Sequence, residues 1–157
     1  MANDGVILIV DDDALIVELL RTYLTGLGYQ TDVAMTGGEA LMLVELNRPD
    51  AVILDLKLPD LSGAEILRRL RSADATIPVL MLTGNTDEGV ARGLLKAGAL
   101  DYICKPVRLE ILETAVTTAV SVGRQRPRRG VVLQFPGTRR ADEHRETSNR
   151  AVGQASM

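Results

Sequence analysis

The sequence predicts an α/β fold in which a mostly parallel five-stranded sheet is covered by helices on both faces. Short apolar runs alternate along the chain with segments of about 10 to 15 residues in which apolar side chains recur at helical spacing. Five such units follow one another. Three of the apolar runs contain no polar residue, which is typical of strands buried on both faces. They are residues 6–10, 51–54 and 78–82.

The first unit joins the strand at residues 6–10 to a helix at residues 14–27. Asp13 stands where this helix needs an N-cap, and Gly28 stands where it must stop. The same reasoning yields the other elements. The remaining expected strands are residues 31–34, 51–54, 78–82 and 101–104, and the remaining expected helices are residues 38–46, 64–71, 86–97 and 108–122.

The composition is that of an ordinary globular domain, with 46% hydrophobic and 25% charged residues in a chain of 157. No apolar run approaches the roughly 18 residues of a membrane span, and the first residues do not resemble a signal peptide. We therefore expect a cytoplasmic protein with no membrane contact. The single cysteine, Cys104, cannot form an internal disulfide, and its apolar neighbours predict that it fills the core.

Charge divides the chain into two parts. Residues 1–123 hold 10 basic and 18 acidic residues, whereas residues 124–157 hold 8 arginines and 3 acids. The acidic balance of the first part argues against a nucleic-acid surface on the folded domain. The second part is expected to be a basic, disordered tail or linker, because it offers little to bury apart from one short apolar island.

Polar residues stand directly after four of the expected strands: Asp11 and Asp12, Asp55, Thr83 and Lys105. Because parallel strands point the same way, these side chains should gather at one edge of the sheet, where open α/β sheets bind their ligands. Three carboxylates at one edge repel one another by about 1 kcal/mol per pair at 4 Å in water, so the cluster requires a cation. Oxygen ligands without histidine or cysteine suit Mg²⁺.

Four motifs follow these strands in order. They are Val10-Asp11-Asp12, Asp55 with Pro59 and Gly63, Thr83-Gly84, and Tyr102-Ile103-Cys104-Lys105-Pro106. Together they resemble the receiver domain of bacterial two-component response regulators, of the chemotaxis-regulator type, over residues 6–122. The resemblance implies a flavodoxin-like, doubly wound sheet with strand order 2-1-3-4-5 and five helices. It also implies a receiver domain at residues 1–123, either standing alone or cut from a longer protein.

The resemblance implies a role for each matching residue. Asp55 is the expected phosphoacceptor, taking a phosphoryl group from a phosphohistidine of a sensor histidine kinase or a histidine phosphotransfer protein in a phosphorelay. Asp12 and the backbone carbonyl of Lys57 are expected as direct Mg²⁺ ligands, with Asp11 helping to hold the ion. Lys105 is expected to pair with a phosphoryl oxygen, and its peptide bond to Pro106 is typically cis in this family.

The same resemblance implies a conformational switch. Thr83 is expected to hydrogen-bond the phosphoryl group, and the movement of its loop would free space into which Tyr102 turns. Tyr102 fits equally well as a half-buried strand aromatic. Asp13 is expected to cap a helix rather than bind metal. Lys57, a departure at a position that is variable in the family, and Asn85 are predicted to tune the lifetime of the acyl phosphate.

The last expected helix carries more apolar surface than one buried stripe requires. Leu112 and Val116 share one stripe, whereas Ile111 and Val122 lie on another side. We expect the surface of the fourth helix, fifth strand and fifth helix to mediate self-association or docking. Within residues 108–122 only the first is basic, which disfavours the ion-paired dimer of winged-helix transcription factors.

The expected class is a signalling module that accepts phosphate, loses it slowly by itself and is not otherwise an enzyme. Two other classes of protein are alternatives. An aspartyl-phosphate phosphatase of the haloacid dehalogenase type also places a nucleophilic aspartate at a strand end, but it needs a second acid where this chain has Lys57. An interaction module that keeps only the fold would not need the complete set of acids together with Thr83 and Lys105.

Overall fold

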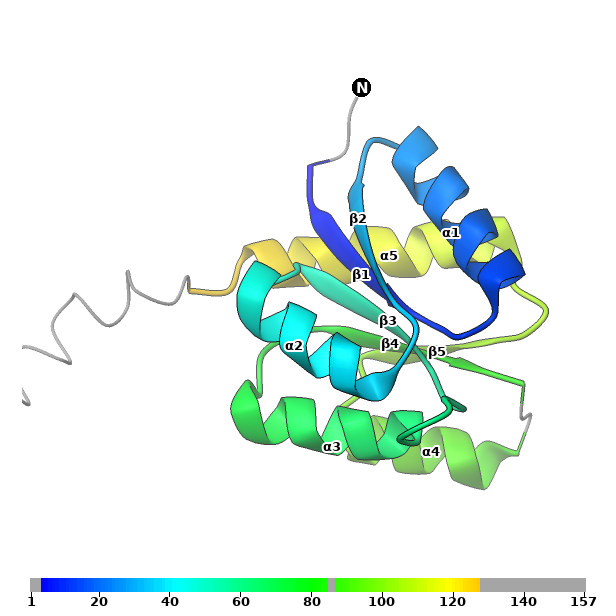
Figure 1. Ribbon diagram of the computed structural model, residues 1–157, viewed down its shortest axis with the longest axis vertical. Helices are drawn as coiled ribbons and strands as arrows, with labels where there is room; N and C mark the ends of the chain where they lie inside the picture. The colour runs from blue at the N-terminus through cyan, green and yellow to red at the C-terminus, as the bar shows by residue number, and fades with distance from the viewer. Residues whose placement is uncertain (1–3, 85–86, 128–157) are drawn as a thin grey trace, which may run out of the picture. The chain divides into compact units, whose positions relative to one another are not determined.

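Ten elements alternate strictly between strand and helix in the computed structural model, which describes residues 4–84 and 87–127 (Figure 1). All ten lie in one compact unit that ends at Gln125. The strands are β1 (Val6–Val10), β2 (Gln30–Ala34), β3 (Ala51–Asp55), β4 (Val79–Thr83) and β5 (Asp101–Cys104). The helices are α1 (Ala14–Gly26), α2 (Gly37–Asn47), α3 (Gly63–Ala73), α4 (Glu88–Lys96) and α5 (Leu109–Arg124).

The five strands form one parallel sheet in the order β2-β1-β3-β4-β5, which confirms the expected fold class. Because the chain runs outward from β1 in one direction and from β3 in the other, the sheet has its switch point between these two strands. The carboxyl ends of all five strands lie at the same edge of the sheet. The side chains at this edge are therefore the first candidates for a ligand site.

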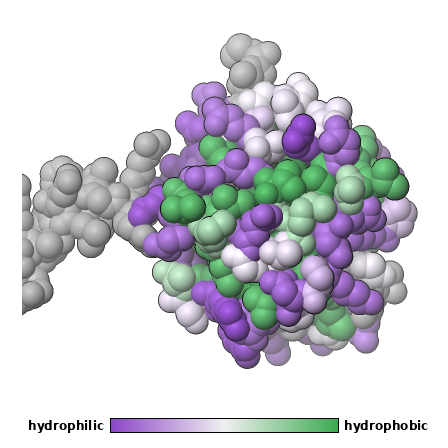
Figure 2. All heavy atoms as spheres, viewed as in Figure 1, coloured by the Kyte–Doolittle hydropathy of each residue, from purple (hydrophilic) through white to green (hydrophobic). Residues whose placement is uncertain are grey.

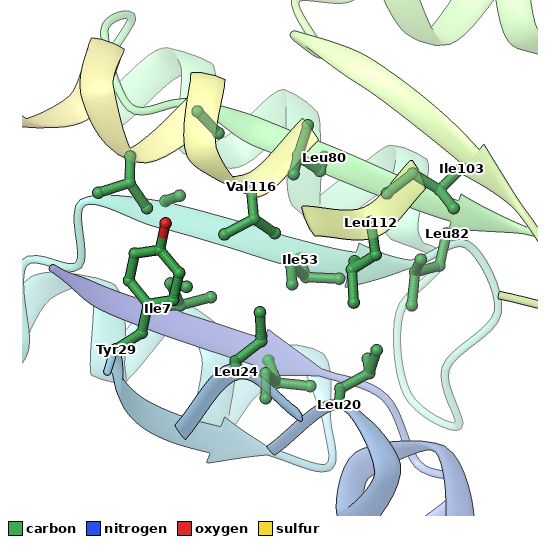
Figure 3. Packing of buried hydrophobic residues seen from close by; sticks show 14 of the residues in the cluster. Ile7, Leu20, Leu24, Tyr29, Ile53, Leu80, Leu82, Ile103, Leu112 and Val116 are labelled. Carbon is green, nitrogen blue, oxygen red and sulfur yellow. The ribbon is translucent and has the colours of Figure 1, made fainter. Parts of the chain in front are cut away.

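Helices cover both faces of the sheet, as the apolar strand runs predicted. Helices α1 and α5 lie on one face, and α2, α3 and α4 lie on the other (Figure 1). Alternate residues of β1 point to opposite faces, so Ile7 and Ile9 pack into the first core cluster while Leu8 and Val10 pack into the second. Figure 3 shows the first cluster, in which Leu112 of α5 lies over the central strands.

Side-chain caps decide where the helices begin. The Asp13 carboxylate accepts hydrogen bonds from the backbone N–H groups of Leu15 (2.9 Å) and Ile16 (3.4 Å), which confirms its role as an N-cap. Helix α4 begins at Glu88, later than the residue 86 expected from the sequence, because Asp87 is its N-cap. Helix α1 ends before Gly28, which adopts a φ of 104°.

The prediction that Cys104 fills the core is wrong, because this side chain is exposed. Strand β5 lies at the edge of the sheet, and of its four residues only Ile103 is fully buried. An apolar sequence at an edge strand therefore does not imply burial of each residue.

The outer surface is mixed in polarity. On the face shown in Figure 2, hydrophobic patches lie among hydrophilic ones. The large exposed hydrophobic residues of α1 and α2 include Leu15, Leu19, Met42 and Leu46. Ile111 and Val122 of α5 are also exposed, as their position off the buried stripe predicted. In the described part of the chain no helix is both long and apolar enough to cross a bilayer.

A carboxylate cluster at the carboxyl edge of the sheet

The polar residues that follow the strands converge at the carboxyl edge of the sheet. Asp11 follows β1, Asp55 ends β3, Thr83 ends β4 and Lys105 follows β5. In the register of the sheet Asp55 pairs with Leu82, one residue before Thr83. The parallel arrangement thus brings together residues that are up to 94 positions apart in the chain.

Three carboxylates form the centre of this site. Asp11, Asp12 and Asp55 each offer an oxygen, and these oxygens lie within 4.8 Å of one another. Asp11 is completely buried and Asp55 is only 6% exposed, whereas Asp12 is exposed. The cluster is therefore buried on the protein side and opens toward solvent beside Asp12. Its donors are oxygens alone, which fits a hard divalent cation such as Mg²⁺.

Lys105 supplies the positive charge of the site. Its Nζ lies 3.0 Å from Oδ1 of Asp55 and 3.2 Å from Oδ2 of Asp11, so one ammonium bridges both buried carboxylates. The other oxygen of Asp11, Oδ1, accepts a hydrogen bond of 2.9 Å from the backbone N–H of Asp13. The peptide bond between Lys105 and Pro106 is cis, as the resemblance implied.

Burial and neighbouring charged groups together shift the pKa values of Asp55 and Lys105. Burial raises the pKa of the Asp55 carboxyl, and the negative charge of Asp11 raises it further, against the hydrogen bond from Lys105. For Lys105, burial by itself lowers the pKa, but the hydrogen bond to Asp55 and the charge of Asp11 outweigh it, and the pKa is raised. The ammonium is therefore held in its charged form beside a carboxylate that is poorly solvated.

Thr83 and Tyr102 occupy neighbouring strands at this edge. Thr83 is completely buried, and its backbone carbonyl accepts a hydrogen bond of 2.8 Å from the N–H of Lys105. Tyr102 is half-buried on β5, where it pairs with Met81. These positions are compatible with the switch expected for the two residues, which stays a prediction.

Lys57 contributes its backbone rather than its side chain. The backbone amide of Lys57 acts to lower the pKa of the Asp55 carboxyl, against the effect of burial. The Lys57 side chain is exposed, and it makes no ion pair within the described part of the chain. Asn85, the other residue predicted to tune the acyl phosphate, lies outside the described residues.

The loop between β3 and α3 packs tightly against the end of the strand. The N–H of Leu56 donates to the carbonyl of Leu82 (3.0 Å), and the N–H of Gly63 donates to the carbonyl of Leu56 (2.7 Å). A Cβ at Gly63 would lie 2.7 Å from the Cα of Leu56, so only glycine allows this approach. Gly63 belongs to the motif that carried the resemblance, and the structure gives it a steric reason.

Sequence reasoning missed one residue near this site. Both carboxylate oxygens of Asp60 accept hydrogen bonds from the start of α2, at 2.8 Å from the N–H of Gly37 and 2.9 Å from that of Gly38. No local pattern predicts this contact, because Asp60 is more than 20 residues from both glycines in the chain. The only sequence signal for a close contact at this place is the pair Gly37 and Gly38, which begins α2 without side chains.

The fold and the carboxylate cluster together define a class of protein. The chain matches the model of the response regulator receiver domain family over residues 7–117, and it belongs to this family. The standard function of the family is to accept a phosphoryl group in a two-component system. These matches do not favour the phosphatase or the phosphorylation-independent alternative.

Particular relatives agree with this assignment. The chain is 46% identical over 106 residues to the response regulator MprA of Mycobacterium sp. (strain KMS), and 43% identical over 106 residues to MprA of Mycobacterium bovis (strain BCG / Pasteur 1173P2). Each alignment covers 68% of this chain and 46% of the relative. The chain thus spans less than half the length of these curated relatives.

Solved structures of receiver domains are similar over most of the folded unit. The CheY-like response regulator receiver domain protein of Methanospirillum hungatei JF-1 has a TM-score of 0.73 at 31% identity, covering 78% of this chain and 98% of that one. The receiver domain of Francisella response regulator 1452 has a TM-score of 0.72 at 31% identity, covering 74% of this chain and 97% of that one.

Proposed function

We propose that Asp55 accepts a phosphoryl group from the phosphohistidine of a sensor histidine kinase or a histidine phosphotransfer protein. The observation that carries this proposal is the contact between the Asp55 carboxylate and the Lys105 ammonium, 3.0 Å apart, beside the oxygens of Asp11 and Asp12. A single nucleophilic carboxylate thus lies among groups that can bind both a cation and the oxygens of a phosphoryl group.

In the proposed reaction an oxygen of Asp55 attacks phosphorus, the bond from phosphorus to the histidine nitrogen breaks, and that nitrogen keeps the electron pair. Lys105 offsets the negative charge of the transferring group, since its ammonium is already fixed at the acceptor oxygen. Mg²⁺ held by Asp11, Asp12, Asp55 and the Lys57 carbonyl would neutralise charge on the carboxylates and the phosphoryl oxygens.

The proposal extends to the response that follows transfer. Thr83 binds the phosphoryl group and Tyr102 turns inward, which alters the surface of β5. Lys57 and Asn85 set how slowly the acyl phosphate hydrolyses. The domain does no other chemistry, and it acts in the cytoplasm.

The surface of α4, β5 and α5 is the proposed place where a partner or a second copy docks. Leu95 on α4, Leu100 before β5 and Ile111 on α5 are all exposed hydrophobic residues in or beside these elements. Sedimentation of the chain before and after phosphorylation tests the self-association version. A single monomeric species in both states would leave docking to a different protein.

Intact mass after incubation with acetyl phosphate and Mg²⁺ tests the central proposal. We expect the wild-type chain to gain one phosphoryl group and Asp55→Asn to gain none. Asp101→Asn is the matched control, because Asp101 is an exposed aspartate at the start of β5 and should leave the gain unchanged. Turnover of acetyl phosphate without a modified protein would support a phosphatase, and no modification of the wild type would remove the proposed function.

A further inference from the structure

The loop that leaves the phosphoacceptor strand is attached to helix α2 by Asp60. This carboxylate accepts the N–H groups of Gly37 and Gly38, the first two residues of the helix. Thr36, the N-cap of α2, accepts the next one, from Glu39, at 3.2 Å. The start of α2 is thus capped by one residue of its own and by one residue of the loop between β3 and α3.

The contact between this loop and α2 is close, and it is favoured by charge. A Cβ at Gly37 would lie 2.7 Å from the Cδ1 of Ile66 in α3 and 3.0 Å from the Cβ of Leu61 in the loop, so the missing side chain lets both approach α2. The N–H groups of Gly37 and Gly38 hold the pKa of Asp60 below its usual value. A carboxylate with two parallel donors at the positive end of a helix dipole is a directional contact.

Lys57 lies three residues before Asp60 in the same loop. Lys57 is two residues from Asp55, and in the proposed function its backbone carbonyl is a metal ligand. The base of the loop is held by the backbone bonds of Leu56 and Gly63, whereas its outer part is held to α2 through Asp60. The backbone orientation at Lys57 therefore depends on attachments at both of these places.

We propose that Asp60 is a positioning residue that holds the loop in the shape in which the backbone of Lys57 serves the metal ion and Asp55. This inference rests on the proposed function, because it assigns Asp60 to the same Mg²⁺ site. Outer partners of metal ligands typically contribute about 10- to 100-fold in affinity. Since Asp60 acts here through a loop, we expect its loss to weaken Mg²⁺ binding by about tenfold, at the lower end of that range.

Mg²⁺ affinity measured by isothermal titration calorimetry tests this inference on the full chain. Asp60→Ala should bind Mg²⁺ about tenfold more weakly, and Asp60→Asn should lie between it and the wild type because its amide oxygen still accepts one N–H. With acetyl phosphate as donor, the Mg²⁺ concentration for half-maximal phosphorylation should rise in parallel. The rate at saturating Mg²⁺ should stay near that of the wild type, since Asp55 and Lys105 are unchanged.

Thr36→Ala is the matched control. It removes the other cap of α2 and should lower thermal stability, but it leaves the bonds from Asp60 in place. Its Mg²⁺ affinity should equal that of the wild type. Equal weakening in Thr36→Ala and Asp60→Ala would overturn the inference, because the effect would then follow the stability of α2 and not the attachment of the loop.

Unchanged Mg²⁺ affinity in both Asp60 variants would also overturn it. If Asp60→Ala does not fold, Asp60→Asn decides by the same comparison. The proposed function fails in a different way, when the wild-type chain itself binds no Mg²⁺ and gains no phosphoryl group. If the wild type is phosphorylated and the Asp60 variants bind Mg²⁺ as tightly as the wild type, the inference about Asp60 fails and the proposed function stands.

Discussion

Replacing Gly63 by alanine should show how closely helix α3 packs against the phosphoacceptor strand. The added Cβ would lie 2.7 Å from the Cα of Leu56 and 3.1 Å from the carbonyl carbon of Asp55, and it would lie closer still to the carbonyl oxygen of Asp55. Carbon atoms in contact prefer about 3.5 to 4.0 Å, so the start of α3 has to move by about 1 Å. All of these neighbours are backbone atoms and cannot rotate away.

We expect Gly63→Ala to lower the free energy of unfolding by about 1 to 3 kcal/mol, the usual cost of an overpacked site. Urea denaturation followed by circular dichroism measures this change. Phosphorylation by acetyl phosphate should slow as well, because the displaced atoms adjoin Asp55. The matched control is Gly93→Ala in α4, where a Cβ would meet nothing within 4 Å.

Gly93→Ala should raise the free energy of unfolding by about 0.5 to 1 kcal/mol, since alanine is the better residue inside a helix. The two glycine variants therefore should change stability in opposite directions. An equal free energy of unfolding for Gly63→Ala and Gly93→Ala would refute the steric argument. It would mean that α3 can move away from β3 at no cost in stability.

Three further predictions concern charges in and beside the site. Lys105→Met should lower the free energy of unfolding by about 3 to 5 kcal/mol, because it leaves the buried carboxylates of Asp11 and Asp55 without their cation. Urea denaturation measures this change, and a loss below about 1 kcal/mol would contradict the bridging role of Lys105. A Mg²⁺ concentration of about 100 times the wild-type dissociation constant should stabilise the wild-type chain by about 2.7 kcal/mol, and EDTA should reverse this gain. At the same Mg²⁺ concentration Asp12→Asn should gain less stability. An equal gain in the wild type and Asp12→Asn would remove Asp12 from the ligand set. The folded-state pKa of Asp60 is lowered from 3.8, so its contribution is present above about pH 4 and lost as pH falls through that lowered pKa. The stability difference between wild type and Asp60→Asn should therefore stay constant from about pH 7 to 5 and shrink below about pH 4, and a difference that grew in acid would have the wrong sign.

The fold and the core of the site could be predicted because both depend on local patterns and one topological rule. Continuous apolar runs require strands covered on both faces, and helical spacing between them requires crossovers. Once the strands are parallel, residues that end them must share an edge. Asp11, Asp55 and Lys105 could be placed together for this reason, and the structure brings them within hydrogen-bond distance.

Contacts that depend on the packing of loops and edges could not be predicted in this way. The exposure of Cys104 follows from the place of β5 at the edge of the sheet, and the sequence around Cys104 does not encode that place. The attachment of Asp60 to Gly37 depends on how α2 and the loop after β3 come to lie side by side. A carboxylate after a proline is, by sequence alone, a turn residue like many others.

The sequence by itself thus determined the order and type of the elements and the set of side chains at the carboxyl edge, because these depend on burial and chain direction. Tertiary structure alone decided which oxygens Lys105 bridges, why position 63 must be glycine, and which loop residue braces α2. These features depend on which atoms come within about 3 Å of one another once loops, helices and strands have packed, and short-range sequence patterns carry no information about such contacts.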